Sequence, residues 1–160
     1  WTAKLNRLGN FLWSLLARKL WESTPSIVSR EFPDIWKNLA QVMGQRPQDK
    51  TISFAIKCLG MNLMMAGEYD FDFTKIPIPV DLRVGKFTKR AGLLTTSDAE
   101  AIRYLWAEIL ASLRNYHPNF TMIHLDSLIW QIASLDNMRL KSYFEDLGIP
   151  QVGNDLMKLL

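Results

Sequence analysis

Two lysines near the start of an apolar segment are the residues in this sequence best suited to covalent chemistry. Lys50 opens a stretch expected to be helical to about residue 65, and Lys57 lies seven residues further on. At about 100° per residue, the two side chains return to nearly the same helix face. The positive end of the helix dipole, the apolar helix and a second cation all favour a neutral Lys50 amine, which could form a Schiff base. Lys57 could instead point into a ligand pocket, or both lysines could lie extended on the surface.

A carboxylate follows a segment stiffened by proline. Residues 76–79 read Ile-Pro-Ile-Pro and must be extended, because each proline disfavours helix in the residue before it. Asp81 comes directly before the next predicted helix, where an aspartate is a typical N-cap. It could also be a carboxylate held ionised by the helix start and aimed at a developing cation, such as an oxocarbenium-like sugar centre.

An acid and an aromatic residue at helical spacing form a third candidate group. Asp126 and Trp130 are four residues apart and therefore share a helix face. The pair suits a purine, because a carboxylate accepts from its N–H edge and an indole stacks on its plane. The alternatives are a helix cap and a core tryptophan. Trp1 or Trp13 could supply a second stacking platform or could equally belong to the core.

The elements that must position these groups are expected to be helices throughout. Apolar spacing, caps and prolines predict helices over residues 5–21, 34–43, 50–65, from 81, from 97 with a capping box over 97–100, over 124–138, and two short ones after that. The expected fold is all-α, a single helical domain over residues 1–160, with a helical hairpin at about 34–65. The chain begins with Trp1 in place of a methionine, so we expect a fragment, a processed chain or an incomplete N-terminus.

Composition and charge narrow the function classes. The sequence is 48% hydrophobic and 22% charged, and its apolar runs are far shorter than the roughly 18 residues of a membrane span. A single cysteine excludes a disulfide framework and favours an intracellular location. The two histidines lack ligand-spaced partners, and neither GxGxxG nor GxxxxGK occurs, so we expect no metal and no organic cofactor.

Two segments could bind phosphates. The net charge is +3, and Arg83, Lys86, Lys89 and Arg90 fall within eight residues, with 83, 86 and 90 close to one helix face. The alternative is a solvated helix face. The turn over residues 44–49 joins two predicted helices, and its backbone N–H groups could contact a DNA phosphate without reading sequence.

The order and spacing of segments 48–57, 76–84 and 123–130 resemble the archaeal 8-oxoguanine DNA glycosylase/lyase family, a branch of the helix-hairpin-helix superfamily. The resemblance implies that Lys50 is the Schiff-base lysine and that Asp81 is the catalytic aspartate. Asp81 stands in a Pro-Val-Asp setting, where most of the superfamily has Gly-Pro-Asp. Lys57, Asp126 and Trp130 match residues that line the pocket for the flipped base.

The expected function is therefore excision of oxidised guanine from double-stranded DNA, followed by β-elimination, by a monomeric enzyme of the cytoplasm or nucleoid. The expected DNA contacts come from the hairpin and the basic helix: Gly44, Gln45, Arg46, Gln48, Arg83 and Lys86. Two alternatives stay open at this point. One is a non-catalytic helix-hairpin-helix DNA-binding module, and the other is a helical interaction domain whose cationic stripe serves an acidic partner.

Overall fold

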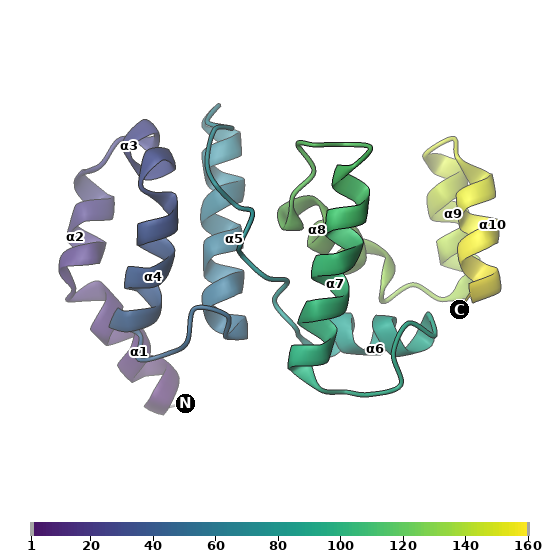
Figure 1. The fold of residues 1–160 in the computed structure, drawn as a ribbon, viewed down its shortest axis with the longest axis horizontal. Coiled ribbons are helices and arrows are strands. Elements are labelled where there is room, and N and C mark those ends of the chain that lie inside the picture. Colours follow the sequence, from purple (N-terminus) through teal and green to yellow (C-terminus); the bar gives the residue numbers. More distant parts are fainter. Residues whose placement is uncertain (1, 160) are drawn as a thin grey trace. The chain divides into compact units, whose positions relative to one another are not determined.

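The fold is built from helices alone. A computed structural model describes residues 2–159, and within this range there are ten helices and no strand (Figure 1). They are α1 (Thr2–Leu12), α2 (Leu15–Glu22), α3 (Pro25–Arg30), α4 (Phe32–Val42), α5 (Lys50–Met65), α6 (Leu82–Arg90), α7 (Ala99–Arg114), α8 (Met122–Ile132), α9 (Asn137–Asp146) and α10 (Pro150–Leu159). The prediction of an all-α fold is confirmed. No helix in the described range is long and apolar enough to cross a bilayer.

The chain divides into two compact units. The first comprises residues 1–79 with 121–123, and the second comprises 80–120 with 124–160. Helices α1 to α5 belong to the first unit, whereas α6, α7, α9, α10 and most of α8 belong to the second. The expectation of one domain over the whole chain stays a prediction, and each unit is described below by itself.

The core of the first unit lies between α4 and α5. Apolar residues at helical spacing face inward from both helices, among them Ile35 and Leu39 on α4 and Ile52 and Ile56 on α5, all buried. The extended segment after α5 adds two aromatic side chains to this core. Phe32 lies 4.8 Å from Phe71 and 5.7 Å from Phe73, measured between ring centroids. The hairpin helices are thus fixed by a shared apolar interface.

The start of the chain differs from the prediction of one helix over residues 5–21. Ser14 interrupts it, because its Oγ accepts a hydrogen bond from the N–H of Ala17 at 3.1 Å and caps α2. A local cap therefore overrides the apolar repeat that runs across this point. The next boundary also shifts: α4 begins at Phe32, and Asp34, predicted as its cap, lies in the first turn.

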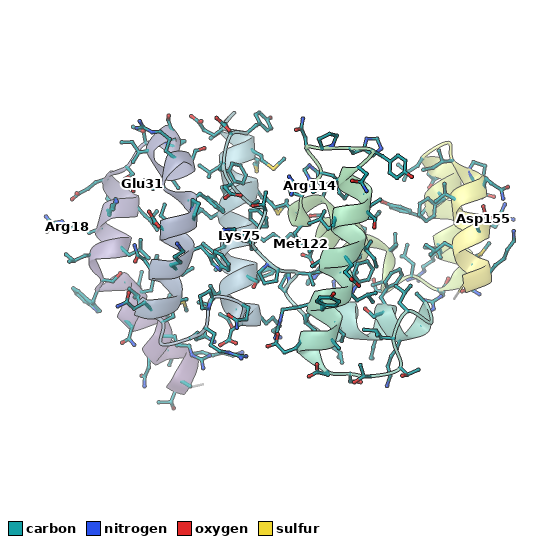
Figure 2. The ribbon with its side chains drawn as sticks, viewed as in Figure 1. Arg18, Glu31, Lys75, Arg114, Met122 and Asp155 are labelled. Atoms are coloured by element: carbon teal, nitrogen blue, oxygen red, sulfur yellow. The ribbon has the colours of Figure 1, made fainter. Side chains whose placement is uncertain are left out.

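Two boundaries in the second unit were also predicted wrongly. The cap of α7 is Asp98, which accepts from the N–H of Ala101 at 2.7 Å, one residue after the start of the predicted capping box. Helix α8 ends at Ile132, because Asp136 caps a separate helix, α9. Helix α7 ends at Arg114, before the His117–Pro118 pair. Arg114 lies in its last turn (Figure 2), and Arg114 Nε donates to the carbonyl of Pro118 at 3.3 Å.

Helix α6 is held in the second unit by a buried polar contact. Thr88 is fully buried; its hydroxyl donates to the carbonyl of Val84 at 2.7 Å and accepts from Trp106 Nε1 at 2.9 Å. The Phe87 ring stacks on Trp106 at 6.3 Å between centroids. Because both polar partners are satisfied away from water, this contact sets the rotation of α6 and the direction of its exposed face.

The contact between α9 and α10 depends on a glycine. A Cβ built on Gly153 would lie 2.9 Å from Phe144 Cβ, so the two helices would have to move apart. We expect Gly153→Ala to destabilise the protein by up to about 2 kcal/mol, because overpacking costs about 1–3 kcal/mol and helix propensity returns about 1 kcal/mol. Gly9→Ala is the matched control on α1, where a Cβ meets nothing within 4 Å.

Urea unfolding followed by circular dichroism checks this pair. Gly9→Ala should raise the free energy of unfolding by up to about 1 kcal/mol, since only helix propensity changes. Gly153→Ala should lower it. A gain in stability for both variants would show that α9 and α10 do not depend on this close approach.

Candidate functional site

The turn between α4 and α5 begins with a glycine in the left-handed region. Gly44 has φ of +61° and ends α4, as predicted. Its N–H donates to the Gln41 carbonyl at 3.1 Å, and the N–H of Gln45 donates to the Ala40 carbonyl at 2.9 Å. Both N–H groups are therefore used to close the end of α4.

The rest of this turn is closed by an arginine–aspartate pair. The Asp49 carboxylate accepts from the Arg46 N–H at 3.0 Å and from Arg46 Nε at 3.1 Å. Trp36 Nε1 donates to the Pro47 carbonyl at 2.9 Å and ties the turn to α4. Asp49 is the N-cap residue of α5, yet it makes no side-chain cap bond, because its carboxylate faces back to Arg46. The first turn of α5 thus lacks the usual carboxylate at its positive end.

The predicted lysines lie on α5 as expected, but in different environments. Lys50 is the first residue of the helix and is exposed, whereas the side chain of Lys57 is buried, with 7% exposure. The burial expected around Lys50 is therefore found at Lys57. The alternative of two lysines extended on the surface is wrong for Lys57.

Two further residues on α5 were missed by sequence reasoning. Ser53 is fully buried one turn from Lys50, on the face that also carries Lys57. Phe54, expected within an apolar and buried helix, is 45% exposed. Helical spacing could have identified both residues, because side chains three and four positions from Lys50 adjoin it on the helix surface.

Asp81 is the N-cap of α6, as predicted. Its Oδ1 accepts from the N–H groups of Arg83 and Val84, both at 2.9 Å. Both bonds use one oxygen, and Oδ2 has no hydrogen-bond partner within residues 2–159. The carboxylate therefore fixes the helix start and still presents one oxygen to a ligand.

Trp130 is covered by an arginine. The guanidinium carbon of Arg83 lies 3.8 Å from the centroid of the Trp130 ring. This distance is that of a cation–π contact. Asp81 and Trp130 are thus linked through Arg83, whose N–H binds the carboxylate and whose side chain covers the indole. The second unit brings together an acid, a cation and an aromatic plane.

Asp126 is fully buried, one turn before Trp130 on α8. It lies inside the helix, which begins at Met122, so the alternative of a helix cap is wrong. Trp130 is half-buried. Asp126 and Trp130 therefore share a helix face, as predicted. The carboxylate of Asp126 is more deeply buried than the indole of Trp130.

The basic residues of α6 have separate roles. Arg90 is half-buried, and its guanidinium donates to the Leu135 carbonyl at 2.9 Å and to Asn137 Oδ1 at 2.8 Å. It holds the segment before α9 and does not belong to a solvated cationic stripe. Lys86 and Lys89 are exposed. Of the predicted stripe, Arg83 and Lys86 are exposed, and the Arg83 guanidinium lies over the Trp130 ring.

The candidate residues fall into two sets. Lys50 and Lys57 belong to the first unit, whereas Asp81, Arg83, Asp126 and Trp130 belong to the second. Convergence of the two sets in one cavity stays a prediction. Within the described residues, no three His, Cys, Asp or Glu side chains gather as metal ligands. Of the two proposed second stacking platforms, Trp13 is 93% exposed, and Trp1 lies outside the described residues.

Comparison with known proteins gives one consistent result. The model of a family described as N-glycosylase/DNA lyase (AGOG) matches residues 1–154. An N-glycosylase/DNA lyase of Methanopyrus kandleri is 31% identical over 117 residues, covering 72% of this chain and 43% of the relative. One of Pyrobaculum aerophilum is 33% identical over 121 residues, covering 72% and 44%. The chain thus spans less than half the length of these curated relatives. No solved structure matches.

Proposed function

Because the chain belongs to the N-glycosylase/DNA lyase family, we propose that it excises 8-oxoguanine from double-stranded DNA and nicks the resulting abasic site. The observation that carries this proposal is the exposed amine of Lys50 at the first residue of α5. It projects from a turn that hydrogen bonds hold in place, as a nucleophile aimed at one sugar carbon requires. The protein would act as a monomer inside the cell.

DNA binding is proposed to begin at the hairpin. The N–H groups of Gly44, Gln45 and Arg46 are used within the turn. The donors for a phosphate are therefore expected at the start of α5, where the N-cap carboxylate is turned away and the helix dipole is positive. Gln45, Arg46 and Gln48 flank this point and would contact the backbone with their side chains. Lys86 would add a second phosphate contact from α6.

The flipped base is proposed to stack on Trp130, with Asp126 and Lys57 reading its edges. Both ionisable groups are buried. Burial keeps water away from both groups, so a base that can bond to them is favoured over an analogue that lacks the matching atoms. Discrimination between 8-oxoguanine and guanine, which differ at N7 and C8, needs a site of this type.

The chemistry is proposed to start with attack of Lys50 Nζ, after it has given up a proton to solvent, on the anomeric carbon of the sugar. The glycosidic C–N bond breaks, and the base leaves with the bonding electron pair and takes up a proton. Asp81, through Oδ2, stabilises the positive charge that develops on the sugar. Opening of the sugar ring then gives the Schiff base, and β-elimination expels the 3′ phosphate and breaks the strand.

A duplex oligonucleotide with one 8-oxoguanine tests this proposal against its rivals. Release of the base and a strand break at the lesion, neither of which occurs on the undamaged duplex, are the expected results. Salt-dependent binding without release would favour the DNA-binding module. Absence of binding at physiological salt would favour the interaction domain with an acidic partner.

A further inference from the structure

We propose that Arg83 is a positioning residue that occupies the stacking face of Trp130 until a base displaces it. The inference rests on the proposed function for the identity of the base. It goes beyond that function because it gives the site a closed state, in which Arg83 covers Trp130. After a base has displaced it, the same Arg83 side chain binds the DNA backbone.

The geometry of the contact between Arg83 and Trp130 supports competition between the guanidinium and a stacked base. The guanidinium carbon lies 3.8 Å from the centroid of the Trp130 ring, the separation that a stacked purine would also need. Trp130 is half-buried, and its neighbours Ile129 and Asp126 are buried in α8. The indole thus stands on a helix anchored in the core, and a planar ligand can reach the covered face only after the guanidinium has moved.

Among the described residues, the Trp130 ring is the group that holds the Arg83 side chain. Within residues 2–159 its guanidinium makes no hydrogen bond and no ion pair, although its backbone N–H binds Asp81. Arg90, on the same helix, instead makes two hydrogen bonds through its guanidinium. A cation–π contact at such a site shifts an equilibrium by about 2- to 30-fold. Arg83 is thus held firmly enough to compete with a base and weakly enough to be displaced.

Displacement has a different consequence for a nucleoside and for DNA. A free nucleoside gains no new contact with Arg83 when it displaces that side chain. Its apparent affinity is therefore its intrinsic affinity multiplied by the fraction of molecules that are open. A flipped nucleotide brings phosphates next to the start of α6, and the released guanidinium can bind one of them. Arg83 should therefore oppose nucleoside binding and support DNA binding.

The test uses the full chain with two ligands. The nucleosides 8-oxoguanosine and guanosine are titrated by calorimetry, and a lesion duplex is titrated by fluorescence anisotropy at several salt concentrations. Arg83→Ala should bind nucleosides about 3- to 10-fold more tightly, because the competing contact is lost. It should bind the duplex more weakly, with a salt slope smaller by about one.

Two variants separate stacking from charge. Arg83→Lys keeps the charge but loses the planar guanidinium, so it should keep duplex binding and gain part of the nucleoside affinity. Lys89→Ala removes an exposed cation from the same helix and should leave nucleoside affinity unchanged. In the Arg83→Ala background, Trp130→Ala should abolish the gain, which assigns the gain to the indole.

Unchanged or weaker nucleoside binding by Arg83→Ala, including no binding by either protein, would overturn the inference. This failure is distinct from failure of the proposed function. A chain that gains nucleoside affinity but leaves the lesion duplex intact would keep the Arg83 switch and lose the glycosylase. A chain that cleaves the duplex without the gain would do the reverse.

Discussion

Lys50→Gln should lower the single-turnover rate of strand nicking at 8-oxoguanine by at least about 10³-fold, because removal of a covalent nucleophile leaves only binding and orientation. Glutamine keeps a polar side chain of similar length but cannot form a Schiff base. Lys50 is exposed at the first residue of α5, so the free energy of unfolding should change by less than about 0.5 kcal/mol. Gel analysis of the nicked strand and chromatography of the released base measure both steps.

The matched control is Lys4→Gln, which removes an exposed lysine from α1. It should nick at the rate of the parent, so that a loss in Lys50→Gln cannot be assigned to a general loss of positive charge. Full nicking by Lys50→Gln would make another amine the nucleophile. Lys57 would then be the next candidate, because it lies on nearly the same face of α5.

Asp81→Asn should slow base release by about 10²- to 10⁴-fold while leaving DNA affinity within about 2-fold, since only the charge facing the developing cation is lost. The structure makes this substitution informative. Asparagine is as good an N-cap as aspartate, and its Oδ1 can still accept from the N–H groups of Arg83 and Val84. Single-turnover base release and thermal unfolding should therefore respond differently, the first strongly and the second hardly at all.

Two further variants separate capping from catalysis. Asp81→Ala should lose activity and also about 1 kcal/mol of stability, because the cap itself is removed. Asp98→Asn changes a carboxylate with the same capping role at the start of α7 and should keep full activity. Equal activity of Asp81→Asn, Asp98→Asn and the parent would reduce Asp81 to a helix cap.

Several elements could be predicted because their signals are local. The start of α5 at Lys50 follows from Gly44 and the polar turn, and the Asp81 cap follows from two prolines that forbid helix before it. The break at Ser14 was missed because the apolar repeat continues across it, and only the side-chain bond to Ala17 decides between the two. Local competition of this kind is decided by about 1 kcal/mol, which periodicity does not resolve.

The places of the candidate residues on their helices followed from the sequence, but the environments of these residues did not. Burial of Lys57 and Asp126 runs against the usual placement of ionisable side chains at the surface. The contact between Arg83 and Trp130 joins residues far apart in the sequence and depends on how α6 packs. Spacing within one helix predicts neither the burial of an ionisable side chain nor a contact between two helices. The resemblance to a family supplied the roles that spacing left open.

Borohydride reduction during reaction with the 8-oxoguanine duplex tests the central claim most directly. Reduction converts a Schiff base between protein and DNA into a stable covalent bond, and proteolysis with mass spectrometry then identifies the modified residue. We predict one adduct, on Lys50, that is absent from Lys50→Gln and from the undamaged duplex. An adduct on another amine, or no adduct with the lesion duplex, would contradict the account.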